Sequence, residues 1–537
     1  MRLKKNIWFI AILIVLSLAA CSKGSTNDAT EPSDEELDNL NEEGFPIVDE
    51  EISLDFFARH DPASNEDWND VFIFNEYAEM TNMNINFEMI PSDSVDEKMN
   101  LAFGGGNLPD VFHASFMGSP TLMKYGEQGI LLPLNDLIDE YAPNFKALME
   151  EYPEIEQSIT MPDGNIYGFP SLGDPDFLSY RTAPMLYINE VWLDELGMDM
   201  PETTDEFYEY LKAVKEEQPG DVDGDVIPFG APTANHLYEN LRGSFGVATK
   251  GAESGYMDED PETGDYRFYA TSDNYKELLQ YMNKLYEEEL LEKNIFSIEH
   301  DQFLANSSEG KYGSTVWYSP THVMGETVGG QYTGMPSLEG PHGDKTFVNV
   351  GGPVGALGSF VLTKENEYPA ASVRWIDYFY GDEGIEMFFM GKEGDTFEKT
   401  DDGEYEYTNK VVGDDEKSFT EQVSKYFTFP GGGQATMIKQ EFFKDAESSE
   451  ISVEAAEKLE DDLIENAWPE LIHTEEENKK LQGFGNDIEK YVEEMRDKFI
   501  SGNESFDNWD KYVSEVEKMN LDEYIDIKIN AIERQVE

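Results

Sequence analysis

The stretch ISLDFFARHDPASNEDWNDVFIFNEYAEMTNMNINFEMIPSDSVDEKMNLAFGGGNLPDVFHAS, residues 52–115, decides the fold class of this chain. Apolar and polar residues alternate in 52–60 and again in 84–91, a pattern typical of strands. Between them, residues 68–82 place apolar side chains at helical spacing, and a second helical segment ends in a Gly-rich break before the short apolar run at 110–113. Strands and helices that alternate in this way predict a parallel sheet covered by helices, which is an α/β fold.

The rest of the chain continues this pattern and then becomes helical. A second α/β run begins at 184–197, and residues 355–390 read as strand, loop and amphipathic helix. The sequence patterns of residues 481–502 and 508–535 are typical of helices, which predicts a helix-rich C-terminus. Roughly 490 residues of foldable chain exceed what one hydrophobic core usually holds, so we expect more than one lobe.

The N-terminus has the pattern of a targeting segment. The basic start MRLKK precedes a short apolar run at 7–18 and two small residues, which predicts a signal peptide over residues 1–20. The following LAAC resembles a bacterial lipobox, and this resemblance implies that Cys21 carries a diacylglycerol group after cleavage. Cys21 is the single cysteine of the chain, so no internal disulfide can form. The alternative is an ordinary signal peptide with an incidental cysteine.

The segment after Cys21 and the overall charge limit the partners. Residues 22–51 are rich in Ser, Asn, Asp and Glu, so we predict a lipidated, acidic, disordered linker over 21–51. The whole chain has 38 Lys and Arg against 112 Asp and Glu, a net charge of −74. Binding of nucleic acid needs a concentrated basic face, which this composition does not offer. Docking of the linker on anionic lipid is excluded for the same reason.

Six stretches follow one another over nearly the whole mature chain: GGGNLPDVF, GEQGILLPLNDLID, DGNIYGFP, LYINEVWLDELGMDMPETTDEFYEYLKAVKE, DYFYGDEGIEMFFMGKEGDTFE and KFISGNESFDNWDKYVSEVEKMNL. Their joint order resembles extracellular solute-binding protein family 1, and in particular its long Gram-positive LplA-like branch of lipoproteins. The resemblance implies a two-lobed, type II periplasmic-binding-protein-like fold. It assigns 52–180 and 350–455 to lobe one, and 181–349 and 456–537 to lobe two.

The resemblance also implies a function. The protein would capture a carbohydrate, as an oligosaccharide, and deliver it to the permease of an ABC importer. It would work without a cofactor, as a lipid-anchored monomer at the outer face of the cytoplasmic membrane of a Gram-positive bacterium. Two alternatives remain: a receptor that presents the ligand to a membrane sensor kinase, and a tethered carbohydrate-active enzyme. The enzyme is disfavoured because G-x-S-x-G and H-E-x-x-H are both absent.

A sugar site needs aromatic planes for the apolar face of the ring and charged or amide groups for its hydroxyls. Trp317 and Tyr318 follow a short apolar strand, where relatives of this family stack an aromatic ring on sugar. Arg181, with Asp176 nearby, precedes the point where the family's chain first crosses between lobes. Its planar guanidinium can donate paired hydrogen bonds to vicinal hydroxyls or to the carboxylate of an acidic sugar. The alternatives are that Trp317 packs in the core, and that Arg181 and Asp176 form an ion pair that only fixes the hinge between the lobes.

Five further residues are candidates for ligand contact. His113 and Phe116 follow the third strand, in a loop where the family places ligand contacts. His236 and Tyr238 open a helix of lobe two where relatives carry a stacking aromatic residue. Phe397 stands where long relatives carry a larger aromatic residue. Each of these side chains could instead be a packed bystander.

A short acidic loop is a candidate calcium site. Asp221, Asp223 and Asp225 alternate as do positions 1, 3 and 5 of a calcium-binding loop, and the family often carries such a loop here. Val226 stands where the sharp-turn Gly would be, and Pro232 where the bidentate Glu would be. The alternative to a structural calcium is a polar turn between helix and strand.

Overall fold

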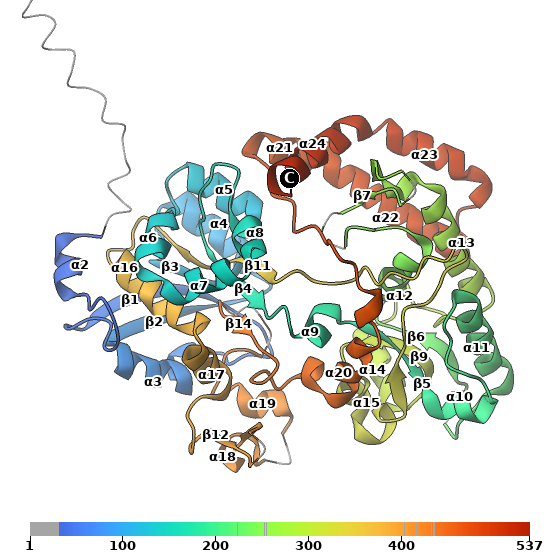
Figure 1. Ribbon diagram of the computed structural model, residues 1–537, viewed down its shortest axis with the longest axis horizontal. Helices are drawn as coiled ribbons and strands as arrows, with labels where there is room; N and C mark the ends of the chain where they lie inside the picture. The colour runs from blue at the N-terminus through green and yellow to red at the C-terminus, as the bar shows by residue number, and fades with distance from the viewer. Residues whose placement is uncertain are drawn as a thin grey trace, which may run out of the picture.

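The structure is a computed structural model that describes residues 32–536 except 223, 252, 254, 262, 402, 415, 416, 431, 433 and 434. The predicted signal peptide and Cys21 lie outside the described residues. Figure 1 shows two α/β lobes side by side, with a cap of helices formed by the C-terminal residues. In the part of the chain that is described, no helix is both long and apolar enough to span a bilayer.

The first sheet confirms the α/β prediction for the opening stretch. Strands β1 (Ile52–His60), β2 (Met83–Pro91) and β3 (Val111–Met117) run parallel, and α3 (Phe72–Thr81) and α4 (Val95–Gly105) connect them. The register pairs Ile52 with Met83 and Phe56 with Val111. Because side chains alternate along a strand, the buried Leu54 and Phe56 share one face of β1.

Strands from later in the chain complete this sheet, whose order is β14-β4-β11-β3-β1-β2. The strand β11 runs antiparallel to both β3 and β4. The remaining strands and helices of this lobe are β4 (Phe169–Gly173), β11 (Val354–Leu362), β14 (Met437–Ile438), α5 (Ser119–Glu127), α6 (Asn135–Tyr141), α7 (Pro143–Glu151), α8 (Pro153–Ile159), α16 (Pro369–Asp377), α17 (Asp382–Met390), the hairpin β12 (Phe397–Lys399) and β13 (Tyr405–Tyr407), α18 (Asn409–Val412) and α19 (Phe419–Val423).

The second sheet has the order β10-β5-β9-β6, with β9 parallel to β6 and antiparallel to β5. Its strands and helices are β5 (Met185–Asn189), β6 (Ile227–Gly230), β9 (Tyr312–Trp317), β10 (Tyr332–Gly334), the hairpin β7 (Met257–Glu259) and β8 (Tyr266–Phe268), α10 (Glu190–Leu196), α11 (Thr204–Glu217), α12 (Ala234–Leu241), α13 (Asp273–Glu287), α14 (His300–Ser308) and α15 (Pro320–Gly329). The C-terminal cap consists of α21 (Glu475–Lys480), α22 (Asn486–Ile500), α23 (Trp509–Glu517) and α24 (Leu521–Gln535). Helix α11 starts in a capping box in which Thr203 and Glu206 satisfy each other's free backbone N–H groups.

Each sheet has its own hydrophobic core. The first core draws on residues 47–177 and 357–443 and on Ile472, and the second on residues 186–348 and on others between 468 and 532. Helices α9 (Leu178–Thr182) and α20 (Glu450–Glu457) flank the crossings, and Ala455 of α20 packs with residues of the second sheet.

The prediction of a disordered linker as far as residue 51 is wrong from residue 32 onward. Helix α2 (Asp34–Asn39) docks on the first lobe, at the edge farthest from the second sheet (Figure 1). Glu36 is 1% exposed, and its carboxylate accepts a hydrogen bond of 2.9 Å from the N–H of Ala371 in α16. Ile47 and Val48 are buried in the first core. The composition is too polar for an independent fold, but a few apolar residues suffice to bind an existing lobe.

Candidate functional site

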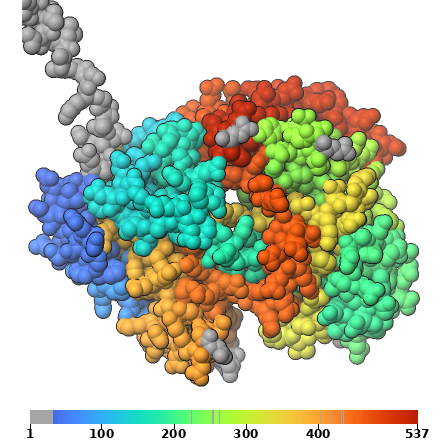
Figure 2. Space-filling model, viewed as in Figure 1, coloured from blue at the N-terminus to red at the C-terminus, as the bar shows by residue number. Residues whose placement is uncertain are grey.

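Two adjoining hollows lie between the lobes, and Figure 2 shows the surface hollowed there at the centre of the view. The first, of about 590 Å³, is lined by Trp317 and is called the Trp317 hollow. The second, of about 630 Å³, is lined by Lys250 and is called the Lys250 hollow. Arg181, Glu253 and Val350 line both hollows, so together they form one cleft.

The Trp317 hollow has an aromatic wall. Trp317 is the last residue of β9, where pairing with Met185 of β5 holds it at the end of the strand that faces the other lobe. Its ring is half-buried and packs 5.3 Å from the ring of Phe303. The ring of Tyr318 stands at 87° to it and is 39% exposed. Both predicted residues therefore line the cleft, together with Tyr180 of α9.

Arg181 fixes the crossing segments to one another. Its Nε donates to the carbonyl of Gly351 at 3.1 Å, and a terminal nitrogen donates to the carbonyl of Pro175 at 2.9 Å. The backbone adds a hydrogen bond of 2.7 Å from the Gly351 N–H to the Arg181 carbonyl. Asp176, the other predicted contact residue, lines neither hollow, and the ion pair with Arg181 that was the alternative is not formed. Two donors of the Arg181 guanidinium are satisfied by backbone carbonyls, and Arg181 lines both hollows of the cleft.

The Lys250 hollow takes one wall from the β7–β8 hairpin. Lys250 forms an ion pair of 2.9 Å with Glu259 of β7. Ser119 of the first lobe donates a hydrogen bond of 3.2 Å to Glu470, which belongs to the segment leading to the C-terminal cap. Burial raises the pKa of Glu470, and the Ser119 hydrogen bond opposes that shift. The C-terminal segment thus connects the two lobes across this hollow.

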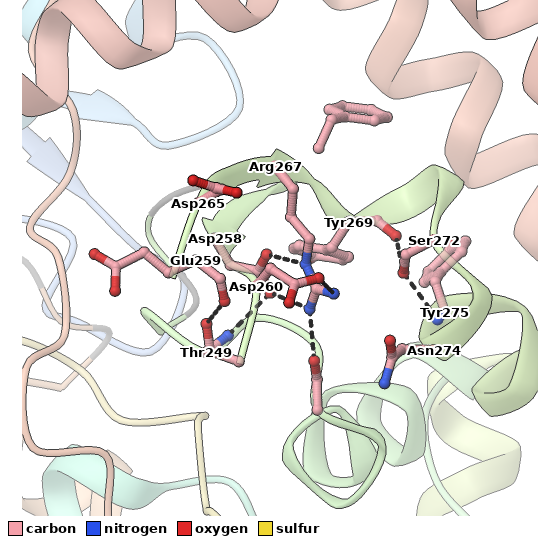
Figure 3. Close-up of polar contacts among 12 residues, drawn as sticks. Thr249, Asp258, Glu259, Asp260, Asp265, Arg267, Tyr269, Ser272, Asn274 and Tyr275 are labelled. Atoms are coloured by element: carbon pink, nitrogen blue, oxygen red, sulfur yellow. Dashed lines mark hydrogen bonds and ion pairs between the residues drawn. The ribbon is translucent and has the colours of Figure 1, made fainter. Parts of the chain in front are cut away.

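A half-buried arginine holds the hairpin in place (Figure 3). Arg267 of β8 points at Asp258 of β7, with Nε 2.7 Å from Oδ1, and donates 2.9 Å to Asp260 and 2.7 Å to the carbonyl of Gly246. Asp258 is 0% exposed. The Thr249 side chain donates to the carbonyl of Glu259 at 2.6 Å, which links this network to the wall of the Lys250 hollow.

The cleft carries far more carboxylates than cations. The acidic residues that line its two hollows are Glu154, Glu253, Glu259, Asp445, Glu447, Glu465 and Glu470, and the basic ones are Arg181 and Lys250. Glu259 has Lys250 as its partner, and Arg181 is bound to backbone carbonyls. A negative potential therefore fills the cleft, which opposes the entry of an anion.

Three predicted contact residues are buried in the cores instead. His113 points into the first core among six aromatic rings at 5.7–6.2 Å, and burial lowers its pKa to about 3. Tyr238 is buried in the second core, with the Arg496 guanidinium 5.0 Å from its ring. Phe397 begins the β12 strand and packs on Tyr405. His113 lies within β3, Tyr238 within α12 and Phe397 at the start of β12, and all three side chains point inward.

Two other predicted residues are outside the cores but line neither hollow. Phe116, at the end of β3, is 37% exposed and lies under the guanidinium of Arg59, 4.3 Å from its ring centre. Its φ of 52° is in the left-handed region, which turns the chain sharply at this edge. His236, in the first turn of α12, lies 2.9 Å from the Thr233 hydroxyl, and burial lowers its pKa.

The structure describes the candidate calcium loop only in part. Asp223 lies outside the described residues. After Asp225 the chain enters β6 at Ile227, whose N–H donates to the Lys311 carbonyl, so the later ligands of a twelve-residue loop have no place here. In the described part of the chain, no group of three or more His, Cys, Asp or Glu residues could hold a metal ion.

The sequence missed several residues that line the Trp317 hollow, among them Tyr180, Phe443 and Glu447. All three belong to short segments near the crossings. Such segments have no periodicity that would reveal which side chains face the cleft.

Comparisons with known proteins agree with this architecture. The model of the family described as bacterial extracellular solute-binding protein matches residues 64–386. The fructooligosaccharide ABC transporter substrate-binding protein FusA of Streptococcus pneumoniae serotype 4 is 28% identical over 543 residues, which cover 96% of each chain. A structure of S. pneumoniae FusA in complex with kestose superposes with a TM-score of 0.73 at 26% identity, covering 89% of this chain and 98% of that one.

A solute-binding protein of Bifidobacterium longum infantis, described as binding HMO, superposes with a TM-score of 0.76 over 90% of this chain and 99% of that one. At 20% identity this likeness establishes the fold alone. The two-lobed, type II arrangement predicted from the sequence is confirmed.

Proposed function

Because this chain belongs to the bacterial extracellular solute-binding protein family, we propose that it captures an oligosaccharide between its lobes and delivers it to the permease of an ABC importer. Members of this family are binding proteins rather than enzymes. The proposal of an oligosaccharide is supported by the similarity to FusA over nearly the full length of both chains. The lipid on Cys21 and the location at the outer face of the cytoplasmic membrane belong to the same proposal.

The observation that carries the proposal is the aromatic wall of the Trp317 hollow. Trp317 and Tyr318 offer ring surface to the apolar face of a sugar, and the neighbouring Tyr180 and Glu447 offer polar groups to its hydroxyls. A ligand that contacts residues of both lobes gains all of these contacts only when the lobes are close together. Its differential affinity for the closed arrangement then draws the lobes together.

The proposal is tested by a binding screen followed by one substitution. Purified protein is heated with fructo-, malto-, chito- and galacturono-oligosaccharides, and the sugars that raise the melting temperature are titrated by calorimetry. Trp317→Ala is expected to lower affinity for the binding sugar more than tenfold, since stacking contributes roughly 0.5–1.5 kcal/mol beyond the burial of the ring. Phe45→Ala removes an exposed aromatic ring remote from the cleft and serves as the control.

If Trp317→Ala binds the sugar as tightly as the wild type does, Trp317 is not part of the site. If no oligosaccharide binds, the assignment of a carbohydrate ligand is wrong.

A further inference from the structure

Glu447 occupies an unusual place for a carboxylate. It lies in the short turn Ala446–Ser448, just before α20, and lines the Trp317 hollow. Among the described residues, no lysine, arginine or histidine lies within 4.0 Å of its carboxylate. No side chain in the described part of the chain donates a hydrogen bond to it either. The carboxylate thus faces the cleft with unused acceptor capacity.

The groups around Glu447 do not neutralise it. The titratable or charged residues that face it or line the same hollow are Asp445, Tyr180, Tyr187, Tyr318, His322, Arg181 and Glu253. His322 lies 3.6 Å from Asp445, and Arg181 donates to backbone carbonyls. Tyr180 and Tyr318 line the same hollow, where burial raises the pKa of both phenols and the charge of Glu447 adds to the shift.

We propose that Glu447 determines the specificity of the cleft by accepting hydrogen bonds from the hydroxyls of a neutral oligosaccharide and by repelling carboxylated sugars. The inference rests on the proposed function and adds the chemical class of the ligand. Hydroxyls are donors that suit an unpaired carboxylate, and a hydrogen bond to an ionised group is stronger than one between neutral groups. A uronate would bring a second negative charge into a cleft that already holds an excess of carboxylates.

The pKa of Glu447 gives this proposal a measurable consequence. Burial raises the pKa of this carboxyl to about 7, and the neighbouring Asp445 adds to the shift. The ionised carboxylate accepts stronger hydrogen bonds from sugar hydroxyls than the protonated carboxyl does, so binding of a neutral sugar strengthens as the pH rises. Between pH 6 and pH 8 the ionised fraction of a group with a pKa of 7 grows about tenfold, and the affinity is expected to follow it by up to that factor.

The experiment measures dissociation constants at pH 6, 7 and 8 by calorimetry. The probes are kestose as the neutral trisaccharide, or the neutral trisaccharide that binds best in the screen above, and trigalacturonate as the acidic one. The variants are Glu447→Gln and, as control, Glu326→Gln, which alters an exposed carboxylate on α15. Melting temperatures of both variants establish that they fold.

Wild type and Glu326→Gln should bind the neutral probe up to about tenfold more tightly at pH 8 than at pH 6, and should bind trigalacturonate much more weakly than the neutral probe at pH 8, where Glu447 is ionised. Glu447→Gln should have a flat profile. The proposal is overturned if the wild-type profile is flat, if Glu447→Gln keeps the pH dependence, or if trigalacturonate binds as tightly as the neutral probe. Those results leave oligosaccharide capture in place, whereas absence of binding by every sugar would remove the proposed function and this inference with it.

Discussion

Arg267→Met should destabilise the second lobe strongly. Arg267 is the cation of a pair whose carboxylate, on Asp258, is 0% exposed. Methionine keeps much of the side-chain volume but leaves that carboxylate buried without its partner, and it also removes the donors to Asp260 and to the carbonyl of Gly246. Breaking a buried pair from one side costs about 3–5 kcal/mol.

Differential scanning calorimetry measures this loss. For a lobe of about 200 residues, each 1 kcal/mol lowers the melting temperature by about 2–4 °C, so the expected shift is roughly 6 to 20 °C. The double variant Arg267→Met with Asp258→Leu should recover most of the stability, because an apolar pair needs no neutralisation. Lys146→Met, which breaks the exposed ion pair with Asp139, should change the melting temperature little.

Two results would refute this reasoning. A melting temperature of Arg267→Met within about 2 °C of the wild type would mean that water or Thr249 compensates the carboxylate. A double variant no more stable than the single one would mean that the loss comes from the shape of the hairpin rather than from the unpaired charge.

The other predictions concern the N-terminal arm, residues 32–51, and the acidic loop, residues 221–225. Burial raises the pKa of Glu36 from 4.5 to about 7, so the folded state holds the proton more tightly and loses stability as the pH rises from about 4.5 to 7. Glu36→Gln should therefore be more stable than the wild type at pH 8, by up to about 3 kcal/mol, and similar to it at pH 4.5, as measured by thermal unfolding. An equal difference in stability at both pH values would show that the raised pKa of Glu36 is not the cause. Millimolar calcium should not shift the melting temperature of the wild type, because the Asp221–Asp225 loop is too short, and a shift that Asp225→Asn abolishes would show that it binds the ion.

The sequence predicted most of the fold and only part of the site. Periodicity located β1, β2, α3 and β3 correctly, because burial of one face imposes a regular spacing of apolar residues. Trp317 and Tyr318 were predicted from the resemblance to relatives and from their position after a short apolar strand, and both line the Trp317 hollow.

The misses share one physical cause. His113 and Tyr238 were chosen for residue type and position along the chain, but the direction of a side chain depends on the local backbone, and both point into a core. Glu447 lies in a short turn with no periodic pattern, so its orientation follows only from the way the lobes are joined. The arm that begins at residue 32 was misread because its few apolar residues bind a surface that only the folded lobe provides.

The most direct test is a crystal structure of the protein with the oligosaccharide that gives the largest thermal shift in the screen. The account predicts a sugar ring against Trp317, with its hydroxyls within hydrogen-bond distance of Glu447 and with residues of both lobes in contact with the ligand. A sugar bound outside the cleft, or inside it without contact to Trp317, would contradict the account.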